Sequence, residues 1–184
     1  MKEELKREII KEIKAELLKE KKVYIELCRE DVKLPVYANI NDAGMDIRAA
    51  IDVEIKEGET KVIPTGIILA IPEGYEIQVR PRSGISLNTP LRIANTPGTI
   101  DSNYRDEIGI IMTNTSNSSH NNDKLYLITE KGNKNGIYKI NKGDRIAQIV
   151  LCKCEKIVFE QVDRGKIENI GINRGGGFGH TGIK

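Results

Sequence analysis

The last eleven residues, R-G-G-G-F-G-H-T-G-I-K from Arg174 to Lys184, carry the chemistry that is easiest to state. Glycine lacks the Cβ that keeps a backbone away from a phosphate, so a run of glycines can expose its N–H groups as an anion nest. Arg174 would supply a guanidinium fork for a terminal phosphate. Phe178 has no hydrophobic face of its own to join and could stack on a planar ring, such as a nucleobase. The tail therefore indicates phosphate and base binding, with a disordered terminus as the alternative.

Four further segments place charged or polar side chains beside turns. Asp46 follows a tight turn at the start of a predicted strand, and Arg82 and Ser83 stand at a bend that Gly84 marks. An acid at a turn or an arginine at a strand end is more often structural than functional, so no single segment decides the chemistry. The four segments are D-A-G-M-D-I (42–47), P-R-S-G (81–84), N-T-P-G-T-I-D-S-N-Y-R (95–105) and G-D-R-I-A-Q (143–148).

The last two of these segments add an acid, a tyrosine and an amide. Asp101 and Tyr104 follow a hairpin turn that is set by a proline and a glycine. Gln148 lies on a predicted strand that begins with an acid. Because side chains alternate along a strand, we expect Gln148 to share a face with Ile146.

The composition indicates one soluble domain with an appendage. The chain has 184 residues, of which 39% are apolar, and this is enough for a single substantial core. Its 29 basic and 27 acidic residues leave a net charge of +2, so no overall basic field favours a nucleic acid or a membrane as partner. We find no segment typical of a membrane span or a signal peptide. The odd set Cys28, Cys152 and Cys154 is typical of reduced thiols, so we expect a cytoplasmic protein.

The N-terminal segment, residues 1–22, is predicted to form an amphipathic helix. Leu5, Ile9, Ile13 and Leu17 are spaced by four and so share one helical face, among alternating lysines and glutamates. This apolar face must pack on the domain, on a copy of itself or on another protein. The sequence does not choose among these three.

Residues 23–173 show the pattern of a β-domain. Short runs of valine, isoleucine and threonine alternate with turn residues, without intervening helices, and this favours a sandwich, a jelly roll or a barrel. The polar stretch 113–123 is predicted to be a surface loop, which we expect to continue through 131–136 as a hairpin, giving an insertion over about 113–136. The clearest predicted strands are 23–28, 46–55, 61–71, 75–80, 91–94, 105–112, 124–129, 145–151 and 156–162.

Together, and in this order, the four segments and the tail resemble the five motifs of the trimeric dUTPase family. The resemblance runs from Leu34 to Gly182, which is nearly the whole β-domain and most of the tail, 174–184. It implies a jelly-roll-like β-barrel that assembles as a homotrimer, in which each active site takes motifs from three subunits. The flexible tail of one chain would then close over a pocket that other chains form.

The reaction that the resemblance implies is hydrolysis of dUTP to dUMP and pyrophosphate, which limits uracil in DNA and supplies dUMP for dTMP synthesis. Water attacks the α-phosphorus while Mg²⁺ holds the triphosphate. Asp101 takes the position of the family's catalytic carboxylate, which orients and deprotonates the water. Arg82, Ser83 and Gln148 would seat and stabilise the phosphates. Asp46 matches an acid that reaches the metal indirectly, through water, and capping a turn is its alternative role.

The same resemblance assigns substrate specificity to the hairpin 95–104 and to the tail. The hairpin backbone and the Asn95 amide would present a hydrogen-bonding pattern complementary to uracil, and Tyr104 would exclude a 2′-hydroxyl. Arg174 would engage the γ-phosphate, although the tail is one residue shorter than usual between Arg174 and Phe178, and Phe178 would cap the uracil. The substrate-binding residues implied in this way are Asn95, Gly98, Thr99, Ile100, Tyr104, Arg174, Phe178, Gly179, His180 and Thr181.

Two alternatives remain open from the sequence. The first is a dCTP deaminase of the same fold, including a bifunctional form that also cleaves dUTP, for which Glu107 is the nearest candidate for the required pocket glutamate. The second is a nucleotide-sensing regulatory protein, in which the N-terminal helix or the insertion 113–136 binds a protein partner.

Overall fold

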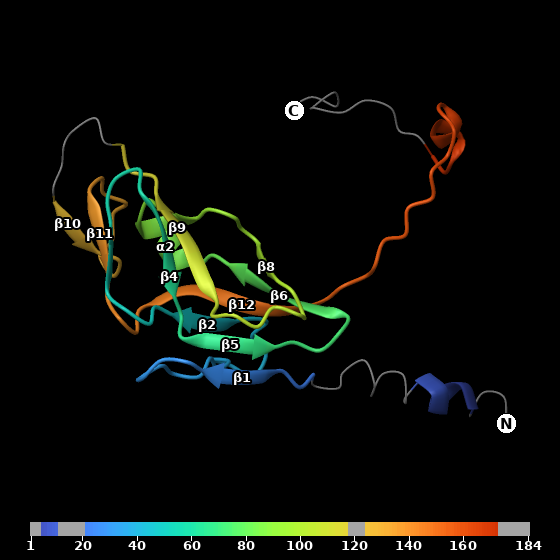
Figure 1. Cartoon of the computed structure of the whole chain (residues 1–184), viewed down its shortest axis with the longest axis horizontal. Coiled ribbons are helices and arrows are strands. Elements are labelled where there is room, and N and C mark those ends of the chain that lie inside the picture. The colour runs from blue at the N-terminus through green and yellow to red at the C-terminus, as the bar shows by residue number, and fades with distance from the viewer. Residues whose placement is uncertain (1–4, 11–20, 118–123, 173–184) are drawn as a thin grey trace. The chain divides into compact units, whose positions relative to one another are not determined.

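The structure, a computed structural model of the chain, describes residues 5–10, 21–117 and 124–172 (Figure 1). The chain divides into two compact units, 1–154 and 155–184. Strands dominate the first unit, so the prediction of a β-domain is confirmed. The strands are β1 (Tyr24–Leu27), β2 (Met45–Arg48), β3 (Val53–Ile55), β4 (Thr60–Pro64), β5 (Ile67–Ala70), β6 (Tyr75–Arg80), β7 (Leu91–Ile93), β8 (Gly98–Ile100), β9 (Gly109–Asn114), β10 (Leu125–Leu127), β11 (Ile137–Ile140) and β12 (Arg145–Lys153). A short helix, α2 (Ser83–Asn88), lies in the first unit, and a 3-10 turn, η2 (Lys166–Asn169), lies in the second.

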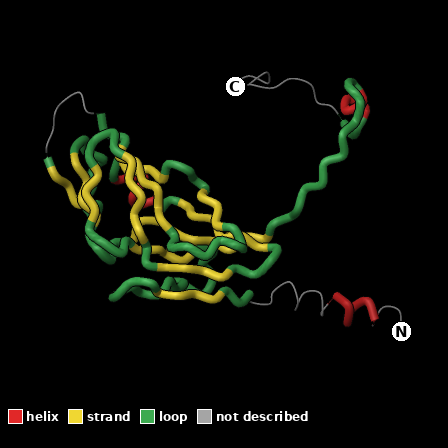
Figure 2. The backbone as a smooth tube through the Cα atoms, viewed as in Figure 1, coloured by secondary structure: helices red, strands yellow, loops and turns green. Residues whose placement is uncertain are grey.

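One antiparallel sheet positions most of the residues singled out by the sequence. Its strands follow the order β2-β12-β6-β8, and Figure 2 shows them among the strands drawn in yellow. Asp46 of β2 lies opposite Gln148 of β12, and Gln148 lies opposite Arg80 of β6. Ile47, Val79, Ala147 and Ile149, which adjoin these three along the strands, are buried in the core. Because side chains alternate, one face of the sheet belongs to the core and the other presents a row of polar groups.

The remaining strands form three smaller sheets, β1-β5, β10-β11-β3 and β4-β9-β7. A common core of mainly isoleucine side chains connects them. Across the described ranges these pairings give four separate sheets and no single closed barrel, so the sequence predicted the strand content better than the closure. Turns that interrupt long apolar runs account for the difference.

Two predicted strands are each divided in two by such turns. Residues 46–55 form β2 and β3, and residues 61–71 form β4 and β5. The second break lies at Gly66, where φ is 71° and a Cβ would collide with the side chain of Val32. Only glycine combines this backbone conformation with so close an approach, and the strand ends there.

The face predicted for Gln148 is wrong. The pairing of β12 with β2 shifts between Arg145 and Ala147, which marks a β-bulge. Ile146 and Ala147 are both buried, whereas Gln148 is partly exposed beside Asp46. A bulge adds one residue to a strand and so reverses the alternation beyond it.

The insertion differs from the predicted polar hairpin. β10 lies within 113–136 and pairs in parallel with β11, which begins directly after it at Ile137, and the two strands of a hairpin cannot pair in parallel. Asn114 is fully buried at the end of β9, although the sequence placed it in a surface loop. Its Nδ2 donates to the carbonyl oxygens of Ile55 and Gly136, at 3.0 and 2.8 Å, and its Oδ1 accepts the Ser116 N–H at 3.0 Å. The Asn114 amide thus satisfies three buried backbone groups, those of Ile55, Gly136 and Ser116, by hydrogen bonds from a side chain.

The structure contradicts the predicted strand 156–162 and describes only part of the predicted N-terminal helix. Residues 156–162 are not a strand, and Ile157, Val158 and Phe159 are 75%, 92% and 89% exposed. Residues 5–10 are helical, and the packing partner of this segment stays a prediction because residues 1–4 and 11–20 lie outside the described ranges. Within those ranges, none of the helices is both long and apolar enough to cross a membrane.

We expect Asn114→Ala to destabilise the first unit by about 2–3 kcal/mol, because buried backbone groups would lose their hydrogen bonds. Denaturant unfolding of this variant, compared with Asn41→Ala at an exposed asparagine, measures the difference. Equal stabilities would show that Asn114 does not hold the insertion.

Candidate active site

A carboxylate lies between two arginines on the polar face of the four-stranded sheet. Arg82 Nε donates to Asp46 Oδ1 at 2.6 Å, and Arg145 Nη1 donates to Asp46 Oδ2 at 3.0 Å. The Asp46 side chain is only 28% exposed, so these charge-assisted contacts are partly shielded from water. Asp46, Arg82, Arg145 and Gln148 are called the Asp46 cluster below. These contacts fix the direction of the Arg82 guanidinium. Arg145 is a residue of this cluster that the sequence did not single out, although it lies in the segment 143–148.

Gln148 ties this cluster to the bend 81–84. Its Nε2 donates to the carbonyl oxygen of Pro81 at 2.8 Å. A Cβ on Gly44 would lie 2.9 Å from Gln148 Oε1, so a side chain at this position would displace the Gln148 amide. A cavity of about 350 Å³ opens here, lined by the Asp46 and Gln148 side chains among others. Ser83 is exposed at the first position of α2, directly beyond the bend.

The hairpin 95–104 lies at the edge of the same sheet. β8 is the last strand in the order and, in the described part of the chain, pairs only with β6. Its other edge therefore offers backbone donors and acceptors to a partner. A Cβ on Gly98 would lie 3.3 Å from Val79 Cβ and 3.4 Å from Asn95 Nδ2, so glycine allows the Asn95 amide to lie against the strand. The structure thus brings Asn95 together with residues 98–100.

Asp101 follows β8 directly and is exposed. Its carboxylate makes no ion pair or side-chain hydrogen bond with any residue that the structure describes. Its carbonyl oxygen accepts the Tyr104 N–H at 3.1 Å, which closes a turn, and Tyr104 Oη donates to the Glu107 carbonyl oxygen at 3.1 Å. This carboxylate is therefore free to accept a proton from an approaching water.

One chain does not bring Asp101 to the Asp46 cluster. The pairing of Val79 with Gly98 and of Ile77 with Ile100 places Asp101 level with Glu76, whereas the cluster is level with Arg80. Four residues along β6 correspond to about 13 Å, and the two groups also lie on opposite sides of β6, about 10 Å apart across the strands. Side chains as short as aspartate and glutamine do not bridge such a separation.

Glu107, the candidate for a deaminase glutamate, is fully engaged. Arg29 donates to it through Nε and Nη2, at 2.6 and 2.7 Å, and the Gly66 N–H donates to its Oε1 at 2.7 Å. The hydrogen bonds from Arg29, followed by the one from Gly66, lower the pKa of Glu107 against the opposing effect of burial. The carboxylate holds loops together and is not free to act on a base.

The donor set excludes a metal cage made by the described residues alone. They contain no cluster of three or more histidine, cysteine, aspartate or glutamate side chains that could hold an ion. Both oxygens of Asp46 already accept from arginines, which leaves it lone pairs for a metal-bound water. Mg²⁺ usually keeps several waters and binds through substrate phosphates, so these residues fit an ion carried by a triphosphate.

The tail residues assigned from the sequence, Arg174, Phe178, Gly179, His180 and Thr181, lie outside the described ranges. Their contribution to the site stays a prediction.

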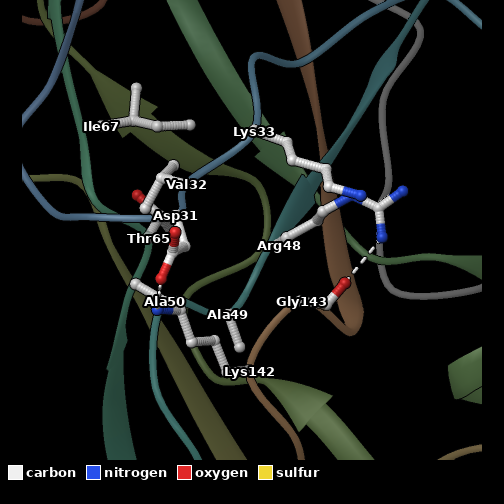
Figure 3. Close-up of a pocket in the computed structure, with 10 residues that line it drawn as sticks. All are labelled: Asp31, Val32, Lys33, Arg48, Ala49, Ala50, Thr65, Ile67, Lys142 and Gly143. Atoms are coloured by element: carbon white, nitrogen blue, oxygen red, sulfur yellow. Dashed lines mark hydrogen bonds and ion pairs between the residues drawn. The ribbon is translucent and has the colours of Figure 1, made fainter.

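A separate cavity, of about 60 Å³, lies between the segment 31–33 and the turn at Lys142 and Gly143 (Figure 3). Arg48 Nη1 donates to the Gly143 carbonyl oxygen at 2.6 Å, and Lys142 Nζ contacts Asp31 Oδ2 at 3.4 Å. No residue of the Asp46 cluster or of the hairpin lines this cavity. Its contacts join two loops and do not belong to the candidate active site.

Comparisons with known proteins agree on one family. Residues 30–124 match the family model described as dUTPase. A deoxyuridine 5'-triphosphate nucleotidohydrolase of Fusobacterium nucleatum is 43% identical over 166 residues, which cover 88% of this chain and 99% of that protein. A mutant dUTPase of Staphylococcus bacteriophage 80alpha, solved with dUpNHpp, is 29% identical with a TM-score of 0.76 and covers 88% of this chain and 99% of its own. A mutant dUTPase of phage phi11 of S. aureus, in which a structural Mg(II) ion is coordinated, is 30% identical with a TM-score of 0.71 over 79% of this chain and 99% of its own.

The contribution of Glu107 to stability should depend on pH. Its pKa in the folded protein lies below the ordinary value of 4.5, so the stabilisation is present above that value and is lost as the pH falls through the lowered pKa. We expect Glu107→Gln to lower Tm at pH 7, and the difference between the two Tm values to shrink as the pH falls below 4.5. Thermal unfolding across this range checks it, with Glu26→Gln on β1 as an exposed control. A constant difference from pH 7 to pH 3 would contradict it.

Proposed function

Because the chain belongs to the dUTPase family, we infer that it hydrolyses dUTP to dUMP and pyrophosphate. The observation that carries this inference is the shared sequence with a deoxyuridine 5'-triphosphate nucleotidohydrolase over nearly the full length of both proteins. The roles proposed below for individual residues are supported by their positions in the fold.

Asp101 is the proposed general base. Its exposed carboxylate has no competing partner in the described structure, and it stands directly beside the strand whose edge would receive the base. A carboxylate in this position can orient a water and take its proton as the water attacks the α-phosphorus. Asp101 would release the proton once the pyrophosphate has left.

The Asp46 cluster is the proposed phosphate side of the site. Asp46 accepts from Arg82 Nε, and the Arg145 carbonyl oxygen accepts from Arg82 Nη1 at 3.2 Å, so the guanidinium has a fixed direction and its remaining N–H groups would face a phosphate. Ser83 at the bend and Gln148 on β12 lie on either side of Arg82 in this proposal, and Gln148 is tied to the bend through the Pro81 carbonyl oxygen. Phosphoryl transfer depends mainly on positioning and charge stabilisation, and preorganised donors supply both. When bound on the triphosphate, Mg²⁺ would neutralise part of its charge, with Asp46 reaching the ion only through water.

The separation of Asp101 from the Asp46 cluster supports a site shared between copies of the chain. A triphosphate whose α-phosphate lies beside Asp101 cannot reach the cluster of the same chain about 13 Å along the strand. A homotrimer with rotational symmetry would bring the cluster of one subunit to the hairpin of the next, giving three equivalent sites. The exposed apolar residues 157–159 are also consistent with burial against another copy.

Recognition of uracil is assigned to the edge of β8. The backbone groups on the edge of β8 that faces away from β6, with the Asn95 amide lying against Gly98, can pair with a planar base. Tyr104 would pack under the deoxyribose and block a 2′-hydroxyl, and the tail, led by Arg174 and Phe178, would close over phosphate and base. A mispaired base would leave buried polar groups unsatisfied, which costs more than the loss of one methyl contact. The same engagement of Glu107 that stabilises the loops argues against deamination of dCTP.

The proposed activity is tested by pyrophosphate release from dUTP, dTTP, dCTP and UTP, with and without Mg²⁺. We expect turnover of dUTP at least 100-fold above the other three nucleotides, stimulated by Mg²⁺, since the site rejects analogues that leave its polar groups unpaired. Asp101→Asn is the matched control and should bind dUTP yet turn it over at least 1000-fold more slowly. Comparable cleavage of all four nucleotides, or full activity of Asp101→Asn, would refute the assignment.

A further inference from the structure

Glu107 connects three segments that are distant in the sequence. Its carboxylate accepts a two-pronged contact from Arg29, which follows β1, and the N–H of Gly66 at the turn between β4 and β5. Its side chain is 24% exposed, in contrast to the 42% of Arg29. A bidentate contact to a half-buried carboxylate restrains both side chains, whereas a single contact at the surface does not. The pair therefore fixes where residue 107 lies.

The loop that ends at Glu107 is the loop that carries Tyr104 and Asp101. The Tyr104 hydroxyl donates to the Glu107 carbonyl oxygen, and the Tyr104 N–H donates to the Asp101 carbonyl oxygen. On the other side, the Ile108 carbonyl oxygen accepts from the N–H and the hydroxyl of Thr65, at 3.2 and 2.7 Å. Thr65 thus holds the loop at Ile108, and Arg29 holds it at the preceding residue, Glu107.

We propose that Arg29 and Glu107 are positioning residues for sugar recognition, acting through Tyr104 and the adjoining turn at Asp101. This inference rests on the proposed function and adds two residues that contact neither the phosphate side nor the base. Arg29 lies outside all five sequence motifs, so the N-terminal strand segment takes part in specificity through a contact with the hairpin loop.

Gly66 is part of the same arrangement. A Cβ at this position would collide with Val32 and approach Arg29 Cβ to 3.3 Å, so the segment 29–32 reaches Glu107 only because the turn is glycine. The Cys28 N–H also donates to the Gly66 carbonyl oxygen at 2.9 Å. Both backbone groups of Gly66 are therefore used to bring Arg29 and Glu107 together.

The test compares Glu107→Gln and Arg29→Lys with wild type in two independent measurements. The first is the ratio of kcat/KM for dUTP to that for UTP. We expect Glu107→Gln to lower this ratio about tenfold, because a displaced Tyr104 no longer blocks the 2′-hydroxyl, and Arg29→Lys to lower it less, because lysine keeps the charge but not the fork. The second is hydrogen–deuterium exchange of residues 98–108 without nucleotide, which should become faster in Glu107→Gln.

Glu130→Gln is the matched control. Glu130 also accepts a backbone N–H, from Leu127, and a basic side chain, Lys134, but it lies in the insertion. It should leave both the ratio and the exchange of 98–108 unchanged. An unchanged dUTP/UTP ratio in a folded Glu107→Gln or Arg29→Lys protein overturns the proposal, even if exchange rises. If wild type fails to hydrolyse dUTP, the proposed function fails, and unchanged exchange would separately show that the pair does not hold the loop.

Discussion

Antiparallel pairing across β2, β12, β6 and β8 sets where every candidate catalytic group can lie. Its register places Asp46 and Gln148 level with the end of β6, beside the bend that carries Arg82. Because β8 runs antiparallel to β6, its last residue, Ile100, pairs with Ile77, and Asp101 therefore lies near the start of β6. Hydrogen-bonded strands cannot slide without turning buried side chains outward, so this separation is a fixed property of the fold. This separation is the reason for proposing that a complete site takes residues from a second copy of the chain.

Within each half of the site, arginine contacts give the functional groups a direction. On the proposed phosphate side, Asp46 accepts from one nitrogen each of Arg82 and Arg145, and Arg82 Nη1 donates to the Arg145 carbonyl oxygen at 3.2 Å. The N–H groups of Arg82 that remain are the ones proposed to meet the substrate. On the proposed nucleoside side, Arg29 donates to the Glu107 carboxylate, and the Glu107 carbonyl oxygen accepts the Tyr104 hydroxyl. Asp46 and Glu107 are thus structural partners of arginines, whereas Asp101, the carboxylate proposed to do chemistry, forms no ion pair with the residues that the structure describes.

Local patterns predicted the strand content well and its interruptions poorly. The run 46–55 has no proline or glycine to mark its turn, and in 61–71 Pro64 and Gly66 stand within a continuous apolar pattern, so the breaks become clear only from tertiary contacts such as that between Gly66 and Val32. α2, β8 and β11 are too short to show a periodicity, and Asn114 looked like a loop residue because its partners are 22 and 59 positions away. The candidate site residues came from five ordered motifs, whereas the contacts of Arg145 and Arg29 depend on sequence separations of 99 and 78 residues that no local pattern contains.

Complementation between two inactive variants tests the shared site most directly. Asp101→Asn and Arg82→Ala chains would be unfolded, mixed in equal amounts and refolded, with wild type treated in the same way as control. In random trimers about three quarters of the assemblies are mixed, and each has one site with both residues intact, so about one quarter of wild-type activity should return. A mixture no more active than the separate variants would show that Asp101 and Arg82 act within one chain.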